Sequence, residues 1–171
     1  MPTGILLVAE RAVTIAAQIA PTPRRILDVG CGFGKYGVLL REYLTPTPRV
    51  DGIELWEPYV EPHRLRGIYE QLHVGDALHL PRKTLDDYDM VMMGDVIEHM
   101  DKQSALAFLG RVRGAVVVAT PVVFFQAGND ELPPTECHVS HWSRADFEGT
   151  GRLDHYEESY GAIIARLSPL P

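Results

Sequence analysis

A run of glycines directly after a short apolar segment is the feature that most constrains this chain. The run is Leu27-Asp-Val-Gly-Cys-Gly-Phe-Gly34, in which three glycines occupy alternate positions. Residues 25–30 are typical of a buried strand, and residues 36–44 are typical of a helix. Because glycine has no Cβ, a strand–loop–helix turn of this kind lets a ligand approach the backbone at the edge of a sheet.

The rest of the chain alternates short apolar strands with helical segments. We expect strands at 49–54, 72–76, 89–95 and 115–120, and helices at 58–66, 102–112 and 143–148. Residues 81–88 are expected to form either a weak helix or an irregular connection. Residues 153–158 and 160–167 are expected to close the sheet as an antiparallel hairpin. Since apolar strands need cover on both faces, this order predicts an α/β fold built on a parallel sheet.

The predicted domain organisation is simple. A length of 171 residues suits one domain, 1–171. Residues 1–20 are expected to form an N-terminal helix, because Ile5, Ala9 and later apolar residues recur at three- and four-residue steps after Thr3, a candidate N-cap. Residues 121–142, rich in proline and polar side chains, are expected to form a substrate-side loop.

Composition excludes several classes of partner. The chain has 16 Lys and Arg against 23 Asp and Glu, a net charge of −7, which disfavours nucleic acid as the main partner. It has no apolar run long enough to span a membrane, and its 2 cysteines make no disulfide framework. We therefore expect a cytoplasmic protein that takes a small molecule as its ligand.

Two cofactors are compatible with the glycine run. Gly32, Gly34 and Gly37 also form the G-x-G-x-x-G pattern of nicotinamide-binding proteins, which leaves an oxidoreductase as one alternative. However, Asp28 places a carboxylate beside the ligand, where it would repel a pyrophosphate and attract a cation. The chain is also too short for a separate substrate domain, so a cationic cofactor is favoured.

The segment from Leu27 to Gly34 resembles the first motif of the class I S-adenosylmethionine-dependent methyltransferases, and the similarity extends from about Ile26 to Leu167. The resemblance implies a Rossmann-like three-layer sandwich with a mostly parallel seven-stranded sheet and a C-terminal antiparallel hairpin. It implies S-adenosyl-L-methionine as the cofactor. The implied cofactor-binding residues are Asp28, Gly30, Cys31, Gly32, Gly34, Glu54, Asp76, Ala77 and Asp95.

Acidic residues end three successive predicted strands. A carboxylate at Glu54 can accept hydrogen bonds from both hydroxyls of a ribose. In the family, the position of Asp76 accepts from the adenine amino group, the N–H of Ala77 meets a ring nitrogen, and Asp95 marks a strand end that contacts cofactor or substrate. Each aspartate alone could simply cap a helix. Their joint placement along one sheet edge favours a binding site.

Two histidines are candidate catalytic residues. His99 closes a segment, residues 95–99, that resembles the D/E-x-x-E-H stretch of small-molecule methyltransferases, and its alternative role is to shape the loop through a backbone bond. His138 lies in the E-x-H-x-S-x-W run 136–142, which resembles a segment of some bacterial members. In one interpretation, Glu136 orients His138 as a base and Trp142 walls the pocket. In the other, the segment is a hydrogen-bonded support of the loop, and Trp142 packs in the core.

We expect no metal site. His99, Cys137, His138 and His141 are the available ligands, and they lack a compact spacing such as C-x-x-C. Cys31 is expected to be a packed residue rather than a nucleophile, since nothing in the neighbouring sequence but a helix N-terminus would activate it.

The sequence thus predicts an enzyme that transfers a methyl group to oxygen or nitrogen of a small molecule by in-line displacement. A sulfonium methyl is already electrophilic, so a base is needed only where the acceptor loses a proton. The alternative is a non-catalytic, cofactor-binding accessory or regulatory subunit of a methyltransferase complex. The short chain is compatible with a homo-oligomer or a partner subunit that completes the pocket.

Overall fold

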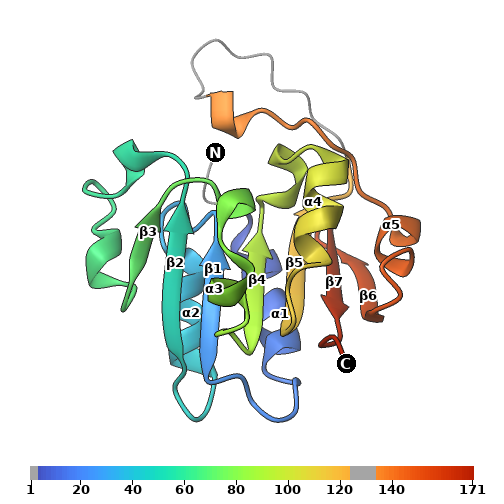
Figure 1. The fold of residues 1–171 in the computed structure, drawn as a ribbon, viewed down its shortest axis with the longest axis horizontal. Coiled ribbons are helices and arrows are strands. Elements are labelled where there is room, and N and C mark those ends of the chain that lie inside the picture. The colour runs from blue at the N-terminus through green and yellow to red at the C-terminus, as the bar shows by residue number, and fades with distance from the viewer. Residues whose placement is uncertain (1–3, 124–133) are drawn as a thin grey trace.

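The computed structural model of this protein describes residues 4–123 and 134–171, which contain a seven-stranded sheet in the order β3-β2-β1-β4-β5-β7-β6 (Figure 1). The strands are β1 (Arg25–Val29), β2 (Arg49–Glu54), β3 (Leu72–Val74), β4 (Met90–Gly94), β5 (Ala115–Pro121), β6 (Leu153–Ser159) and β7 (Ala162–Leu167). Only β7 runs antiparallel to its neighbours β5 and β6. The predicted mostly parallel sheet with a C-terminal hairpin is confirmed.

Helices cover both faces of the sheet and make three layers (Figure 1). On one face lie α1 (Leu6–Ala16) and α2 (Lys35–Tyr43), and on the other lie α3 (Arg82–Leu85), α4 (Lys102–Leu109) and α5 (Arg144–Glu148). None of the helices in the described ranges has the length and hydropathy needed to cross a bilayer.

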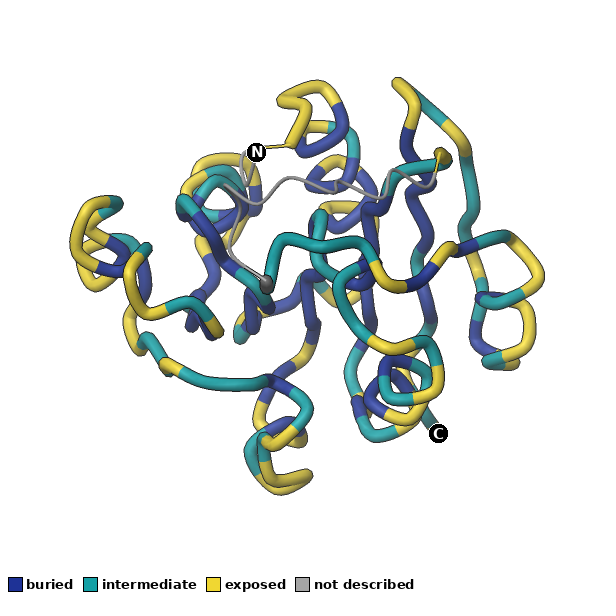
Figure 2. Tube along the Cα trace, turned by 90° about the horizontal axis from the view of Figure 1, so that it is seen from above, coloured by how far each residue is buried: buried dark blue, intermediate teal, exposed yellow. Residues whose placement is uncertain are grey.

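The central strands explain why the core has two halves. In β4 the side chains of Met90 and Met92 pack under α1 and α2, whereas Val91 and Met93 pack under α4 and α5. All four residues are 0% exposed, and the central strands form the buried middle of the molecule in Figure 2. An apolar residue at every position is what a strand covered on both faces requires.

The N-terminal helix is shorter than the predicted range 1–20. It spans Leu6–Ala16, after which the chain leaves the helix through tight turns before Pro21. Ile5 occupies the N-cap position and is 53% exposed, so it is not part of the buried stripe. Thr3, the predicted cap, lies outside the described residues.

The helix predicted at 58–66 is absent from the structure. Its place is taken by two short 3₁₀ helices, η1 (Glu57–Tyr59) and η2 (Leu65–Gly67). Pro62, inside the predicted range, carries no N–H to donate, and Arg64 has a left-handed backbone with φ of 52°, which together prevent a continuous helix. Residues 81–88 contain the short helix α3, which confirms the helical alternative for this segment. The helix predicted at 102–112 forms but ends at Leu109.

The predicted substrate-side loop, 121–142, is described in part. Pro121 still belongs to β5, and residues 124–133 lie outside the described residues. The chain is described again from η5 (Pro134–Glu136), which lies above the carboxyl ends of the parallel strands in Figure 1. The following residues pass over the turn that leaves β4.

Candidate active site

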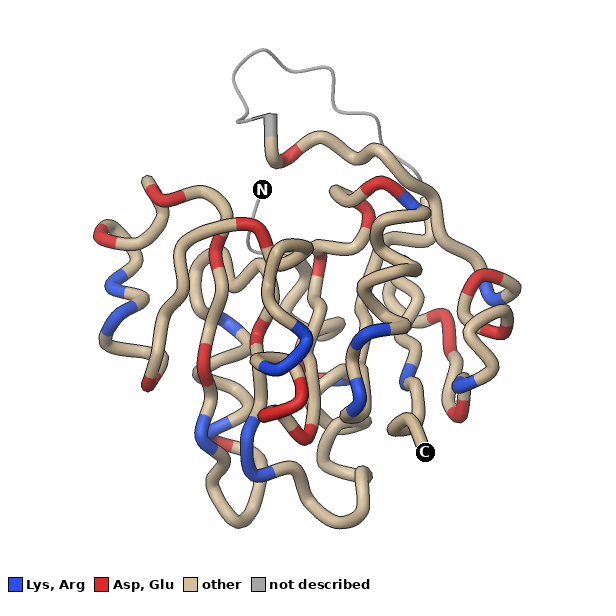
Figure 3. The backbone as a smooth tube through the Cα atoms, in the orientation of Figure 1, with Lys and Arg blue, Asp and Glu red and all other residues tan. Residues whose placement is uncertain are grey.

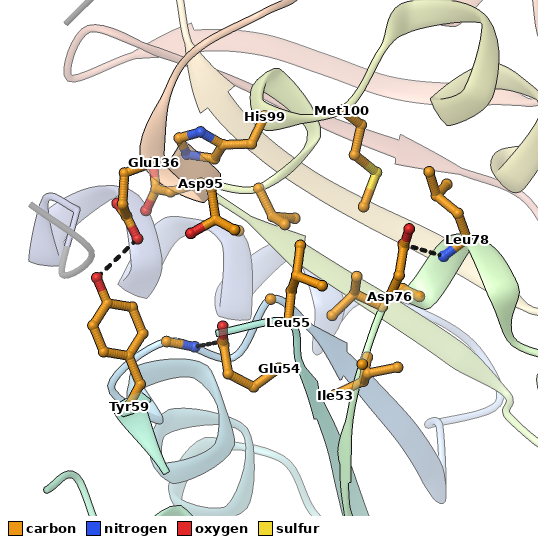
Figure 4. Close-up of a pocket in the computed structure, with 18 of the residues that line it drawn as sticks. Ile53, Glu54, Leu55, Tyr59, Asp76, Leu78, Asp95, His99, Met100 and Glu136 are labelled. Carbon is orange, nitrogen blue, oxygen red and sulfur yellow. Dashed lines mark hydrogen bonds between the residues drawn. The ribbon is translucent and has the colours of Figure 1, made fainter. Parts of the chain in front are cut away.

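A cavity of about 220 Å³ opens at the carboxyl ends of β1, β2 and β4 (Figure 4). The chain builds β2 and β3 on one side of β1 and β4 and β5 on the other, so the cavity lies where the strand order reverses. Ligands of open α/β sheets bind at this point. Among the lining residues are Gly30, Gly32, Glu54, Tyr59, Asp76, Ala77, Asp95, His99, Asp101 and Glu136.

The glycine run forms the floor of one side of the cavity. Gly30, Gly32 and Gly34 all have positive φ, at 65°, 50° and 81°. A Cβ at Gly30 would lie 2.3 Å from a methyl of Val96, and one at Gly34 would lie 2.4 Å from a methyl of Ile68. Gly30 and Gly32 line the cavity, whereas Gly34 serves the packing of the loop.

Glu54, at the end of β2, presents an oriented carboxylate to the cavity. Its Oε2 accepts a 2.7 Å hydrogen bond from the N–H of Gly32, and its Oε1 accepts a 2.8 Å bond from the N–H of Trp56. Burial raises the pKa of Glu54, and these two backbone donors oppose the rise. The predicted ribose-binding position is therefore occupied by a buried carboxylate that is held in place from two sides.

Asp76 and Ala77 line the cavity beyond Glu54. The Oδ1 atom of Asp76 accepts a 2.8 Å hydrogen bond from the N–H of Leu78, which makes it the cap of the short helix η3 (Ala77–His79). The capping role and the predicted adenine-binding role are compatible, because the second carboxylate oxygen is not needed for the cap.

Asp28 and Cys31 lie beneath the loop and do not line the cavity. Asp28 is 1% exposed, and the hydroxyl of Tyr69 donates a 2.6 Å hydrogen bond to its Oδ2. Burial raises the pKa of Asp28 to about 7, an effect that the Tyr69 bond opposes. Burial also raises the pKa of the Cys31 thiol, as expected of a packed cysteine. The structure thus places both residues in support of the loop.

Asp95 and His99 form the opposite end of the cavity, after β4 (Figure 4). Asp95 has a left-handed backbone with φ of 55°, and its Oδ2 lies 3.3 Å from Nζ of Lys35. Nδ1 of His99 lies 3.1 Å from the carbonyl oxygen of Cys137. Because a carbonyl only accepts, Nδ1 carries the proton in this contact and Nε2 of the neutral ring keeps a lone pair.

His138 lies against His99 and outside the cavity wall. The two rings are nearly perpendicular, at 76°, with centroids 4.8 Å apart. Burial lowers the pKa of His138, and the charge of His99 lowers it further. The structure therefore brings the two predicted catalytic histidines together, although α4, β5 and the segment after β5 lie between them in the chain.

Glu98 was not selected by the sequence analysis, although it belongs to the same D-x-x-E-H segment. It is 3% exposed, and its Oε2 accepts a 2.9 Å hydrogen bond from Oγ1 of Thr120. Burial raises its pKa to about 8. The only signal in the sequence was its position next to His99, which does not show which way the side chain faces.

The segment 136–142 differs from its predicted arrangement. Glu136 accepts a 3.1 Å hydrogen bond from the hydroxyl of Tyr59 across the cavity mouth (Figure 4), and the orienting of His138 by Glu136 stays a prediction. Trp142 is 1% exposed and stacks on Phe147 in the core. The hypothesis that Trp142 walls the pocket is wrong, and the core alternative is confirmed.

The cavity is acidic. Five carboxylate residues line it, and within the described ranges no lysine or arginine does; they are Glu54, Asp76, Asp95, Asp101 and Glu136. In Figure 3, acidic positions gather at this edge of the sheet and the basic positions lie mostly farther down. A field of this sign favours neutral or positively charged ligands.

Comparison with known proteins identifies the family that this chain resembles. The family model described as methyltransferase domain matches residues 26–117, more than half of the chain. A search of curated proteins finds no match to the sequence. The three solved structures described below share 16–18% of its sequence, so their similarity shows the fold alone.

Three of these structures cover nearly all of the chain. The N-terminal domain of EvdMO1, with SAH bound, has a TM-score of 0.66 and 18% identity, with 95% of this chain and 81% of that chain covered. The magnesium protoporphyrin IX methyltransferase ChlM from Synechocystis PCC 6803, with SAM bound, has a TM-score of 0.67 and 16% identity. The match covers 96% of this chain and 79% of that chain. The mitomycin 7-O-methyltransferase MmcR has a TM-score of 0.65 and 18% identity, and the match covers 95% of this chain and 54% of that chain.

These three structures resemble this chain in fold. The family match, which begins at the strand before the glycine run, confirms the family predicted from Leu27–Gly34. The chain belongs to the methyltransferase-domain family, that of the class I S-adenosylmethionine-dependent methyltransferases.

Proposed function

We propose that this protein transfers the methyl group of S-adenosylmethionine to an oxygen or nitrogen of a small molecule by in-line displacement. The observation that carries the proposal is one cavity with two chemically different ends. Glu54, Asp76 and Ala77 line one end, and Asp95 and His99 line the other. The first end suits a nucleoside, and the second suits an acceptor that must be held and deprotonated.

The residues at the first end fit the cofactor. Gly30 and Gly32 expose backbone without side chains, which allows close approach of a ligand. Glu54 would accept from the ribose hydroxyls, and Asp76 with Ala77 would bind the adenine. The bound cofactor supplies an electrophilic methyl group on a positively charged sulfur, which the acidic lining of the cavity stabilises.

The residues at the second end fit an acceptor group. With Nδ1 of His99 directed at the carbonyl of Cys137, Nε2 is the atom that would receive the proton of an acceptor hydroxyl or ammonium. His138 packs against this ring and limits its rotation. The sulfur keeps the electron pair of the broken carbon–sulfur bond, and the acceptor forms the new bond to the methyl carbon.

The proposal is tested with radiolabelled S-adenosylmethionine and a panel of hydroxyl- and amine-bearing small molecules. Transfer of label to an acceptor supports it. His99→Gln is then expected to lower turnover by roughly 10²–10⁴-fold with little change in the affinity for S-adenosylhomocysteine. His141→Gln, a change at an exposed neighbour, serves as the control. If the protein binds S-adenosylhomocysteine but methylates nothing in the panel and copurifies with a methyltransferase, the accessory role replaces the enzymatic one.

A further inference from the structure

We propose that Glu98, His99 and His138 bind a divalent transition-metal ion at the acceptor end of the cavity. One ligand atom from each of these residues lies within 4.8 Å of the other two. In the described part of the chain, these three residues form the cluster of His, Cys, Asp or Glu side chains close enough together to hold a metal ion. The consequence for the acceptor, given below, rests on the proposed methyltransferase function. The metal site itself does not.

The donor set suits a particular class of ion. Two imidazole nitrogens and one carboxylate oxygen are the ligands of catalytic zinc sites and of iron or manganese centres that keep open positions. Magnesium prefers oxygen ligands and is disfavoured here. Glu98 and His99 are consecutive in the short helix η4 (Ile97–His99), and His138 comes from the segment after η5.

The outer contacts of these side chains are those that orient metal ligands. The Nδ1–H of His99 is directed at the carbonyl of Cys137 at 3.1 Å, which leaves Nε2 as the coordinating atom. Oε2 of Glu98 accepts from the hydroxyl of Thr120 at 2.9 Å. Ligating histidines and carboxylates in proteins are usually held by such second contacts, which fix both the tautomer and the direction of the side chain.

The backbone holds the two halves of the site together. The N–H groups of Val139 and Ser140 both donate to the carbonyl oxygen of Glu98, at 2.8 and 3.0 Å. Oγ of Ser140 donates to the carbonyl oxygen of Ile97 at 3.2 Å. The segment that carries His138 is therefore attached to η4 next to the other two ligands, so the site is formed before any ion binds.

The surrounding charges also favour a cation. The Glu98 carboxylate is 3% exposed, and the described residues include no lysine or arginine within ion-pair distance of it. Asp95 and Glu136 lie close enough to add to the negative potential at its position. A buried carboxylate without a cationic partner is costly, and a bound divalent ion would provide that partner.

The site defines a class of acceptor. Since His99 lines the cavity, the open positions of the ion would face the acceptor, and a hydroxyl with a second oxygen on the adjacent carbon could chelate it. Coordination lowers the pKa of a hydroxyl. Its proton passes to water, the oxygen attacks the methyl carbon, the carbon–sulfur bond breaks, and its electron pair stays on sulfur. His99 then holds the ion rather than the proton.

Metal binding is measured directly on protein freed of metal with a chelator. Mn²⁺ is followed by electron paramagnetic resonance and Zn²⁺ by calorimetry, and we expect one ion per chain. His138→Ala and Glu98→Gln are each expected to weaken binding by more than about tenfold. His141→Ala, which removes an exposed histidine three residues from His138, is expected to bind as the wild type does.

Two results would overturn the site: no binding of either ion at millimolar concentration, or binding unchanged in both variants. Circular dichroism checks that Glu98→Gln is folded. If it is not, His138→Ala decides, because its side chain is only partly buried. Chelation of the acceptor is refuted if methyl transfer to a vicinal diol proceeds equally well with and without the chelator. Titration of the metal-free protein with S-adenosylhomocysteine, in the presence of the chelator, measures cofactor binding. It therefore tests the proposed function separately from the metal site.

Discussion

The backbone N–H of Gly32 donates a 2.7 Å hydrogen bond to Oε2 of Glu54, which joins the loop after β1 to the end of β2. The other carboxylate oxygen accepts from Trp56 at 2.8 Å. Both oxygens are therefore oriented before a ligand arrives, and the glycine loop cannot shift without moving the carboxylate. This relationship makes Glu54 the residue on which cofactor affinity is expected to depend most.

Replacing Glu54 should weaken cofactor binding. In Glu54→Gln the ribose hydroxyls lose a charged acceptor, a change of about 1.5–3 kcal/mol, or roughly 10- to 150-fold in the dissociation constant of S-adenosylhomocysteine. Calorimetry measures it. Glu57→Gln, at an exposed position three residues later, is the matched control and should bind normally. Equal affinities of Glu54→Gln and the wild type would remove Glu54 from the site.

Gly30→Ala should lower both stability and cofactor affinity. The alanine would have to keep a left-handed backbone with φ of 65°, and its Cβ would lie 2.3 Å from a methyl carbon of Val96. We expect the free energy of unfolding to fall by about 2–4 kcal/mol, from backbone strain and the clash together. Urea denaturation measures the loss.

Gly161→Ala separates the two causes of this loss. Gly161 has a similar φ of 78°, but nothing lies within 4 Å of an added Cβ. We expect it to cost only the backbone strain, about 1–2 kcal/mol, with normal cofactor binding. If the two alanine variants are equally destabilised, the contact with Val96 contributes nothing.

The buried Asp28 should make stability depend on pH. Its folded-state pKa of about 7 lies above the ordinary 3.8, so between these values the folded chain binds more protons than the unfolded chain. The contribution of Asp28 to the free energy of unfolding is therefore complete below about pH 4 and is lost as the pH rises to about 7.

Asp28→Asn removes this dependence, because the amide does not titrate yet still accepts from the hydroxyl of Tyr69. Urea denaturation from pH 4 to 7 should give a smaller decline for Asp28→Asn than for the wild type. Asp87→Asn, whose side chain is 61% exposed, should follow the wild-type slope. Parallel slopes for Asp28→Asn and the wild type would show that Asp28 is ionised at neutral pH in the folded protein.

The buried Arg152 should be essential to the stability of the sheet edge. Its guanidinium donates to the carbonyl oxygens of Leu109, Val112, Gly114 and Ser168 at 2.7 to 3.0 Å, joining the end of α4 to the segment after β7. An ammonium group does not have this planar set of donors. Arg152→Lys is expected to lower the free energy of unfolding by about 2–4 kcal/mol, measured by urea denaturation.

A surface arginine provides the comparison. Arg144 forms an exposed pair with Glu148 at 2.7 Å, one helical turn apart. Arg144→Lys should change stability by less than about 0.5 kcal/mol, since exposed pairs contribute little. A loss in Arg152→Lys no larger than this would mean that water replaces the missing donors.

The parts of the fold that follow from local pattern were predicted well. Apolar residues at every position of 90–94 indicate a strand covered on both faces, and the glycines after residue 29 indicate the turn that follows β1. The helix expected at 58–66 did not form because Pro62 interrupts the range that its apolar spacing predicted. Net charge, length and apolar pattern do not determine the surroundings of the Asp28 side chain. Its burial beneath the glycine loop results from packing.

The two ends of the cavity differ in how well the sequence alone predicts which residues meet there. Glu54 ends β2, and Asp76 and Ala77 come just after β3, so parallel pairing alone brings them to one edge. The approach of His138 to Glu98 and His99, and of Glu136 to Tyr59, joins residues far apart in the chain. Those contacts depend on how the segment after β5 returns over the sheet, and such a path is set by long-range packing and hydrogen bonds rather than by local spacing.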